Sequence, residues 1–148
     1  MTSRFTELVI DCHDPRRLAD FWMALLGYEV LDERDDLIEI AAWEPTVEEV
    51  LALATPPTLI FVQVPESKSI KNRLHLDLSP VDNSHAEEID RALQLGATRV
   101  DVGQGEQPWE VLADPEATSS ACCGVSPLTT RIVLIVHDQL GRVVDSTR

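Results

Sequence analysis

One pattern occurs twice in this sequence. In the first copy, ELVIDC (residues 7–12) precedes a stretch of helical periodicity that ends at Gly27; in the second, HLDLSP (residues 75–80) precedes one that ends at Gly96. Glu7 lies 20 residues before Gly27, and His75 lies 21 residues before Gly96. Such a repeat indicates one supersecondary unit used twice. If a pseudo-twofold axis relates the units, Glu7 and His75 can point from equivalent strands into one cleft, where a carboxylate and an imidazole would form half of a metal site.

Composition and charge limit the class of protein. The 148 residues suffice for one compact domain, and 44% hydrophobic with 26% charged residues is typical of soluble globular proteins. The net charge of −14 would repel nucleic acid and anionic membranes, so we expect neither as a partner. No run approaches ~20 apolar residues. Residues 1–11 lack a signal-peptide pattern, and the cysteines form neither a C-x-x-C pair nor a disulfide framework. We therefore expect a cytoplasmic protein with reduced thiols.

The first copy predicts the element order β-α-β-β-β. Residues 5–12 alternate as a strand, with Leu8, Ile10 and Cys12 on one face and Glu7, Val9 and Asp11 on the other. Asp14 and Pro15 are typical of the start of a helix that Gly27 ends. Further strands are predicted over residues 28–32, 37–41 and 58–64. The connection over residues 42–57 is longer than a hairpin between two strands needs. Thr46 can cap a short helix over residues 47–54, and the segment is either a surface excursion or a flap over the cleft.

The second copy repeats this order. Residues 73–79 alternate, with Arg73, His75 and Asp77 on one face of the predicted strand. Asn83 or Ser84 caps the next helix, and strands follow over residues 98–102 and 109–113.

These motifs resemble the vicinal oxygen chelate superfamily, and within it the glyoxalase-like and bleomycin-resistance-like proteins. The resemblance covers residues 5 to about 116 and is carried by DCHDPRRLADFW, Leu26-Gly27-Tyr28, FVQVPESKSIKNRLHLDL, LGATRVDVGQG and WEVLADPE. It implies an α+β fold of two tandem βαβββ modules whose curled mixed sheet surrounds a cleft. The modules would span residues 1–65 and 73–116 of one domain, residues 1–148, with a linker at 66–72 and an atypical tail at 117–148.

The resemblance also implies site residues. Enzymes of this superfamily usually carry one metal ligand on the first and fourth strand of each module, and the first three positions fall on Glu7, Gln63 and His75. The fourth is commonly a glutamate in a closing strand that reads like DPEGNEFC. Here Asp114-Pro115-Glu116 is followed by ATSSACC. Deleting one nucleotide from GC-rich codons for EGNEFCVL gives EATSSAC, so we infer that the chain after Glu116 is read out of the ancestral frame.

This departure places Ser119 at the position of the acidic ligand. The apolar run TRIVLIV (residues 130–136) could fill the vacant strand position, because a sheet without its last strand would expose unpaired backbone. His137 could stand in as a ligand.

Glu7 and His75 are the candidate catalytic and metal-binding residues. Imidazole titrates near neutral pH and ligates metals well. The alternatives are a solvated strand carboxylate for Glu7 and, for His75, a strand histidine bonded to a neighbour such as Asp77.

Four further residues are candidates for ligand binding. Gln63 carries a neutral amide, which is a poor metal ligand and more often orients a ligand by hydrogen bonds. Arg73 could grip a carboxylate bidentately at the cleft mouth or belong to a solvated linker. Asp77 shares the predicted face of His75, and Trp109 is either core or cleft wall.

The sequence thus predicts a protein that binds a small organic molecule in the cleft between its modules, with metal chemistry weakened or lost. The alternatives are a divalent-metal-dependent isomerase, lyase or dioxygenase, and a resistance protein that sequesters a drug. One carboxylate, one imidazole and one amide hold a divalent metal poorly. We therefore expect no tightly bound cofactor and at most weak binding of zinc, nickel, manganese or iron. Because related proteins often pair their modules across a dimer, we also expect a homodimer.

Overall fold

The computed structural model describes two compact units, Met1–Ser67 and Lys68–Arg148. Described residues are 4–52, 54–66, 76–101, 109–117, 120–124 and 131–132; for residues 109, 120–124 and 131–132 this applies to the backbone alone. The boundary between the units falls within the predicted linker. In the described part of the chain, no helix has the length and apolar character needed to cross a membrane.

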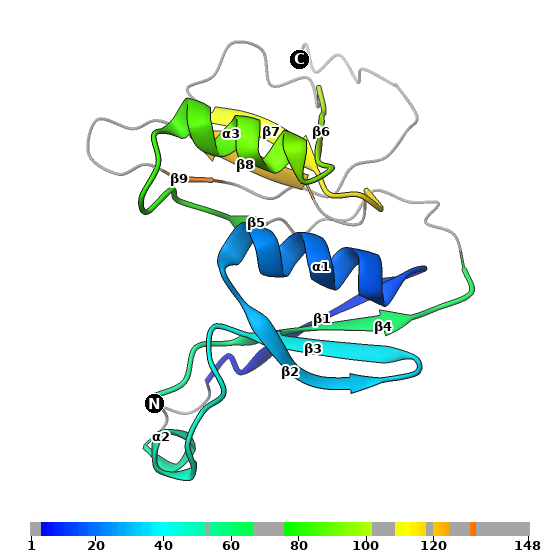
Figure 1. The fold of residues 1–148 in the computed structure, drawn as a ribbon, viewed down its shortest axis with the longest axis vertical. Coiled ribbons are helices and arrows are strands. Elements are labelled where there is room, and N and C mark those ends of the chain that lie inside the picture. Colours follow the sequence, from blue (N-terminus) through cyan, green and yellow to red (C-terminus); the bar gives the residue numbers. More distant parts are fainter. Residues whose placement is uncertain are drawn as a thin grey trace, which may run out of the picture. The chain divides into compact units, whose positions relative to one another are not determined.

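The first unit is a four-stranded sheet with one helix packed on it (Figure 1). Its elements are β1 (Glu7–Cys12), α1 (Pro15–Leu26), β2 (Glu29–Arg34), β3 (Leu37–Ala41), α2 (Val47–Leu51) and β4 (Thr58–Gln63). The strand order is β1-β4-β3-β2, in which β1 runs parallel to β4 and the other pairs are antiparallel. The parallel pair requires a crossover between its strands, and α1 lies in that crossover.

Helix α1 begins and ends where the sequence predicts. The Asp14 side chain accepts a hydrogen bond from the Arg17 backbone N–H at 3.0 Å, and Pro15 occupies the first turn, where no backbone N–H is needed. Gly27 ends the helix at φ 71°, and its N–H bonds to the Met23 carbonyl at 2.9 Å. Glycine adopts this left-handed conformation without steric cost.

The core of the first unit lies between α1 and the sheet. The largest fully buried side chains there are Trp22 and Leu18 of α1, Ile40 of β3 and Phe61 of β4. The Phe21 and Trp22 rings meet edge to face with centroids 5.5 Å apart. The sequence periodicity of α1 predicted this apolar face.

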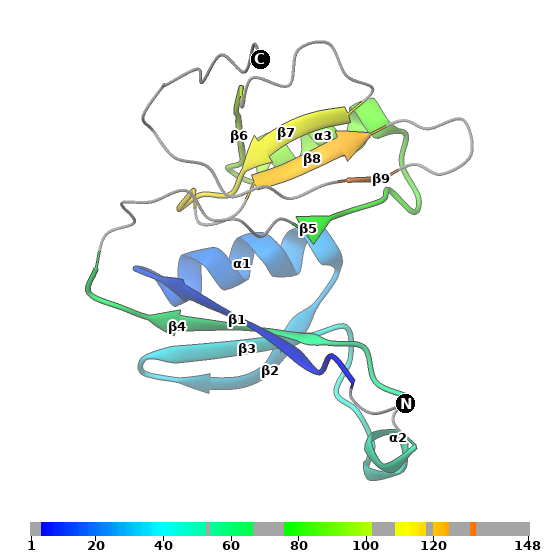
Figure 2. The ribbon, with the colours of Figure 1, turned by 180° about the vertical axis from the view of Figure 1, so that it is seen from behind.

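Helix α2 confirms the predicted capping of a short helix by Thr46. The Thr46 side chain accepts from the Glu49 N–H at 3.3 Å, and the Glu49 carboxylate accepts from the Thr46 N–H at 2.8 Å. The helix lies beyond the end of the sheet (Figures 1 and 2), and none of its residues is buried. Its role as a flap stays a prediction.

The second unit has the same strand order as the first. Its elements are β5 (Leu76–Asp77), α3 (His85–Gln94), β6 (Thr98–Arg99), β7 (Trp109–Ala113), β8 (Ser120–Gly124) and β9 (Arg131–Ile132). The order is β5-β8-β7-β6, with β5 parallel to β8 and with β9 paired to β8. Figure 2 shows α3 behind β7 and β8. Both units together confirm the predicted α+β class.

The tail provides the closing strand from a segment that the sequence analysis did not expect. We predicted residues 130–136 for that position, and this prediction is wrong, because Ser120–Gly124 lies between β5 and β7. The chain reverses at Asp114, so the residues that follow the turn reach β7 first and pair with it as a hairpin, from Ala113 opposite Ser120 onward. Arg131–Ile132 pairs instead with the C-terminal end of β8, at Cys123 and Gly124.

This turn holds a non-glycine residue in the left-handed region. Ala117 has φ 53°, at the position where the family-like sequence DPEGNEFC has glycine. An L-residue in this conformation costs roughly 1–2 kcal/mol. We therefore expect Ala117→Gly to raise the free energy of unfolding of the protein by about 1 kcal/mol, measured by urea denaturation. Ala86→Gly, an exposed position in α3, is the matched control and should lower it by a similar amount. If Ala117→Gly did not raise the free energy of unfolding, the backbone at Ala117 would not be strained.

Helix α3 carries a buried carboxylate that is paired with a guanidinium. Glu88 accepts hydrogen bonds from Arg91 Nε and from Asn83 Nδ2, both at 3.0 Å, and only 9% of its side chain is exposed. The Arg91 guanidinium holds the pKa of Glu88 below its ordinary value, and Asn83 adds to this effect.

This pKa shift has a defined consequence for stability against pH. A lowered pKa in the folded protein stabilises it above the ordinary value of the carboxyl group, and this stabilisation is lost as the pH falls through the folded pKa. We expect Glu88→Gln to lower the free energy of unfolding by about 1 kcal/mol at pH 7, and the difference from the wild type to shrink toward pH 3. Urea titrations at the two pH values test this. A difference independent of pH would show that the charge of Glu88 is not responsible.

Candidate functional site

The first sheet has one face toward α1 and one face away from it, which we call the open face. On β1, Ile10 and Cys12 are buried toward the helix, whereas Glu7, Val9 and Asp11 are exposed. Strand alternation therefore places these three side chains on the open face. The sequence predicted the same division of this strand.

Strands β4 and β3 continue the open face. Glu7 pairs with Thr58, Val9 with Ile60, and Asp11 with Val62. On β3, Glu39 pairs with Ile60 and Leu37 with Val62. Partners across a ladder project to the same side of the sheet, so Glu7 stands next to Thr58 at one end of the face.

Thr58 and Glu39 are site candidates that the sequence analysis did not name. The Thr58 hydroxyl donates to Glu39 Oε1 at 2.7 Å, and both side chains are half-buried. This hydrogen bond holds the Glu39 carboxylate beside Thr58, which is the register partner of Glu7. The sequence carries no clear signal for Thr58, because residues 59–62 are all apolar and do not alternate.

The structure does not bring Gln63 to Glu7. Gln63 pairs with Cys12, five residues along β1 from Glu7, which is roughly 16 Å of strand. It also has the parity of Leu59 and Phe61, which are buried toward α1. The prediction that Glu7 and Gln63 share one cleft is therefore wrong. Gln63 Nε2 instead donates to the His13 carbonyl at 3.1 Å, at the loop that leads into α1.

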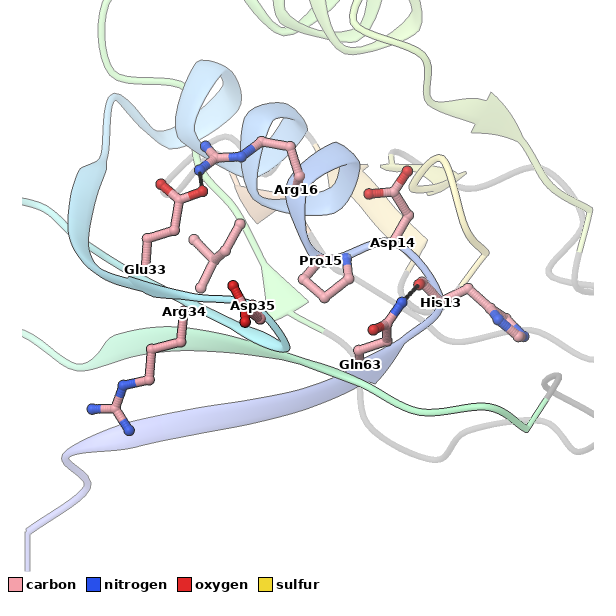
Figure 3. Close-up of a pocket in the computed structure, with 9 residues that line it drawn as sticks. His13, Asp14, Pro15, Arg16, Glu33, Arg34, Asp35 and Gln63 are labelled. Carbon is pink, nitrogen blue, oxygen red and sulfur yellow. Dashed lines mark hydrogen bonds and ion pairs between the residues drawn. The ribbon is translucent and has the colours of Figure 1, made fainter.

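Gln63 lines a separate pocket of about 360 Å³ on the helix side of the first unit (Figure 3). The other lining residues are His13, Asp14, Pro15, Arg16, Glu33, Arg34, Asp35 and Ile38. Arg16 forms ion pairs with Glu33 and Asp20, and the Glu33 carboxylate raises the pKa of the Arg16 guanidinium above its ordinary value. Figure 3 shows the His13 and Arg34 side chains directed away from the centre of the pocket. Its walls thus consist mainly of charges already paired within the unit.

The second unit holds the remaining predicted site residues. Asp77 is exposed on β5, where its backbone pairs with Cys122. Trp109 begins β7 opposite Gly124. His75 and Arg73 lie outside the described residues. The convergence of Glu7 and His75 in one cleft therefore stays a prediction.

The described residues do not fit a resident metal ion. Across residues 4–52, 54–66, 76–101 and 109–117, no three side chains of His, Cys, Asp or Glu come together in a way that could hold one. Glu7 pairs with Thr58, and Gln63 lies on the other face of the sheet. We derive no chemical step through a metal.

Comparison with known proteins gives the family. The sequence matches the model of the glyoxalase-like domain over residues 7–122, which is most of the chain. The protein belongs to the glyoxalase-like domain family. This match begins at Glu7, the first residue of β1, and reaches into β8.

Three solved structures are similar to this chain. A glyoxalase/bleomycin resistance protein/dioxygenase family enzyme from Burkholderia phytofirmans PsJN is 16% identical, with a TM-score of 0.51 over 75% of this chain and 90% of that one. An integron cassette protein from the mobile metagenome of V. cholerae is 12% identical, with a TM-score of 0.46 over 78% and 90%. The oxidase ChaP-H2 is 14% identical, with a TM-score of 0.44 over 94% and 98%. No curated protein matches the sequence significantly. At these identities, the first structure supports the vicinal oxygen chelate fold, and activity has to be argued from the site.

Proposed function

We propose that this protein binds a small organic molecule on the open face of its first sheet, with Glu7 at one edge of the site. The observation that carries the proposal is the apolar surface exposed there. Val9 is 52% exposed, whereas its neighbour Ile10, on the helix side, is 9% exposed. Ile60, Val62 and Leu37 are each only half-buried.

An apolar centre on an exposed sheet face favours binding. A sheet whose second face is exposed to solvent ordinarily carries polar residues on that face. Here the valine, leucine and isoleucine side chains pair in register across β1, β4 and β3, so they form one continuous patch. Apolar patches bordered by polar side chains are typical of ligand or partner sites. Thr58 and Glu39 supply polar groups at its border.

The second unit enters the proposal through four residues that the sequence predicts as candidates. We propose that His75, Asp77 and Arg73 present polar groups to the ligand and that Trp109 packs on it. The family membership and the identical strand order of the two units support this assignment.

A pair of valine variants tests the location of the site. Fragments that include aromatic acids, dicarbonyl adducts and glycopeptides are titrated into ¹⁵N-labelled protein, and we expect amide shifts in Val9, Ile60 and Val62. Val9→Thr should weaken binding of the best fragment about fivefold, because a hydroxyl replaces a methyl group that the bound fragment would cover. Val47→Thr, at a 77% exposed position of α2, is the matched control and should have no effect. Shifts confined to the pocket around Gln63 would contradict the location.

We also propose that the protein forms a homodimer, which the family membership supports. The protomer mass is 16.5 kDa, so light scattering is expected to give about twice this value. If light scattering at high protein concentration gave the mass of a single protomer, the protein would not be a dimer.

A further inference from the structure

The open face carries a strong excess of negative charge around its apolar centre. Glu7 and Asp11 lie on β1 and Glu39 lies on β3. The register of β2 adds two more carboxylates, because Asp32 pairs with Glu39 and Glu29 pairs with Ala41. Arg34, which pairs with Leu37, is the basic side chain that the described strands contribute to this face.

Most of these charges are already bound within the unit. Arg34 forms an ion pair with Asp32 at 2.7 Å, Glu29 accepts from the Glu44 backbone N–H at 3.2 Å, and Glu39 accepts from Thr58. Glu7 and Asp11 differ from them, since neither makes a hydrogen bond or an ion pair with a described residue. Both are exposed.

The two uncommitted carboxylates flank the apolar centre. Glu7 and Asp11 stand two residues before and after Val9 on the same strand, so each lies roughly 7 Å along the strand from it. A ligand whose apolar body covers Val9 and Ile60 therefore brings its polar end next to one of them. Partial burial by that body lowers the local screening, which strengthens attraction to a positive charge and repulsion of a negative one.

We propose that the ligand of the open face is an organic cation, an ammonium group attached to an apolar body, and that Glu7 and Asp11 select it by charge. This inference rests on the proposed function. A cation complements the charge of this face, because Arg34 is paired with Asp32 whereas Glu7 and Asp11 have no ion pair with a described residue. An ammonium group can also donate hydrogen bonds to either carboxylate.

Three probes with the same phenyl body and different charge test the inference. Phenethylammonium, 2-phenylethanol and 3-phenylpropionate are titrated separately into the ¹⁵N-labelled full chain at low ionic strength. We expect phenethylammonium to shift the Val9 and Ile60 amides with at least tenfold higher affinity than 3-phenylpropionate. Raising the salt concentration should remove most of this advantage, because exposed charges are screened.

A matched pair of variants assigns the effect to the two carboxylates. Glu7→Gln/Asp11→Asn should lower the affinity for phenethylammonium to that for 2-phenylethanol, about tenfold. Asp35→Asn removes an exposed carboxylate of the helix-side pocket instead and should leave the affinity unchanged. Equal or tighter binding of 3-phenylpropionate or 2-phenylethanol on the same amides would overturn the charge selection and leave the proposed site standing. Failure of all three probes and of the fragment library to shift these amides would overturn both.

Discussion

Phe61→Ala is expected to lower the free energy of unfolding of this protein by about 3–5 kcal/mol, the range for truncating a buried phenylalanine. Phe61 is fully buried at the centre of β4. Its register partners are Ile10 on β1 and Ile38 on β3, which are also buried, and α1 packs over this part of the sheet. The substitution leaves a cavity against all three elements. Because small domains are stable by only about 5–15 kcal/mol, we expect a large unfolded fraction at moderate temperature.

Urea denaturation followed by tryptophan fluorescence measures this effect, because Trp22 is buried in the same core. Val47→Ala is the control, since Val47 is exposed on α2 and its truncation should change the free energy of unfolding by less than about 0.5 kcal/mol. Phe61→Leu keeps most of the apolar volume and should give an intermediate loss. A loss below about 1 kcal/mol for Phe61→Ala would show that this side of β4 is not the core.

The sequence predicted the ends of helix α1 more closely than the ends of strands β2 and β4. Asp14, Pro15 and Gly27 act through local backbone chemistry, so they mark the ends of α1 without knowledge of the rest of the chain. Strand ends depend on partners distant in sequence. The predicted strand over residues 58–64 accordingly ends at Gln63, and the one predicted over residues 28–32 runs to Arg34.

The error at Gln63 has a physical cause. Gln63 was assigned to the site because the family resemblance implies a ligand on this strand. The resemblance does not say which face of the sheet the side chain occupies. A single-residue difference in parity moves a side chain to the other face of a sheet. Residues 59–62 of that strand are all apolar, so the sequence alone does not show which parity faces the core. Glu7, Val9 and Asp11 were placed on the correct face because the alternation of their own strand was used.

The closing strand of the second unit could not be predicted from residue patterns. SACCG has neither the length nor the β-branched residues that indicate a strand, whereas residues 130–136 have both. The position in the sheet is determined by chain connectivity. The turn at Asp114–Ala117, in which the Ala117 N–H bonds to the Asp114 carbonyl at 2.9 Å, delivers the next residues to β7 before any later segment can reach it.

The protein as it stands is expected to bind zinc, nickel and manganese at least about 100-fold more weakly than a variant in which residues 117–121 are replaced by GNEFC. The reason is the group at position 119, where the resemblance implies an acidic ligand and the chain has Ser119. A hydroxyl brings no negative charge to offset the loss of water from the cation. Changes in groups that only support ligands already alter metal affinity by roughly 10- to 100-fold, and loss of a ligand should cost more.

Isothermal titration with each metal compares the two proteins, and Ser119→Glu alone tests whether the ligand rather than the turn is responsible. Ala117→Gly is the control, because it restores the glycine of the turn and adds no ligand, so its metal affinity should equal that of the wild type. His75→Ala in the repaired protein should abolish the gain if the histidine of the second repeat is part of the same site. If the unmodified chain binds any of these metals as tightly as the repaired one, another group supplies the missing charge. His137 is then the first residue to replace, since the tail that removed the acidic position also introduced this imidazole.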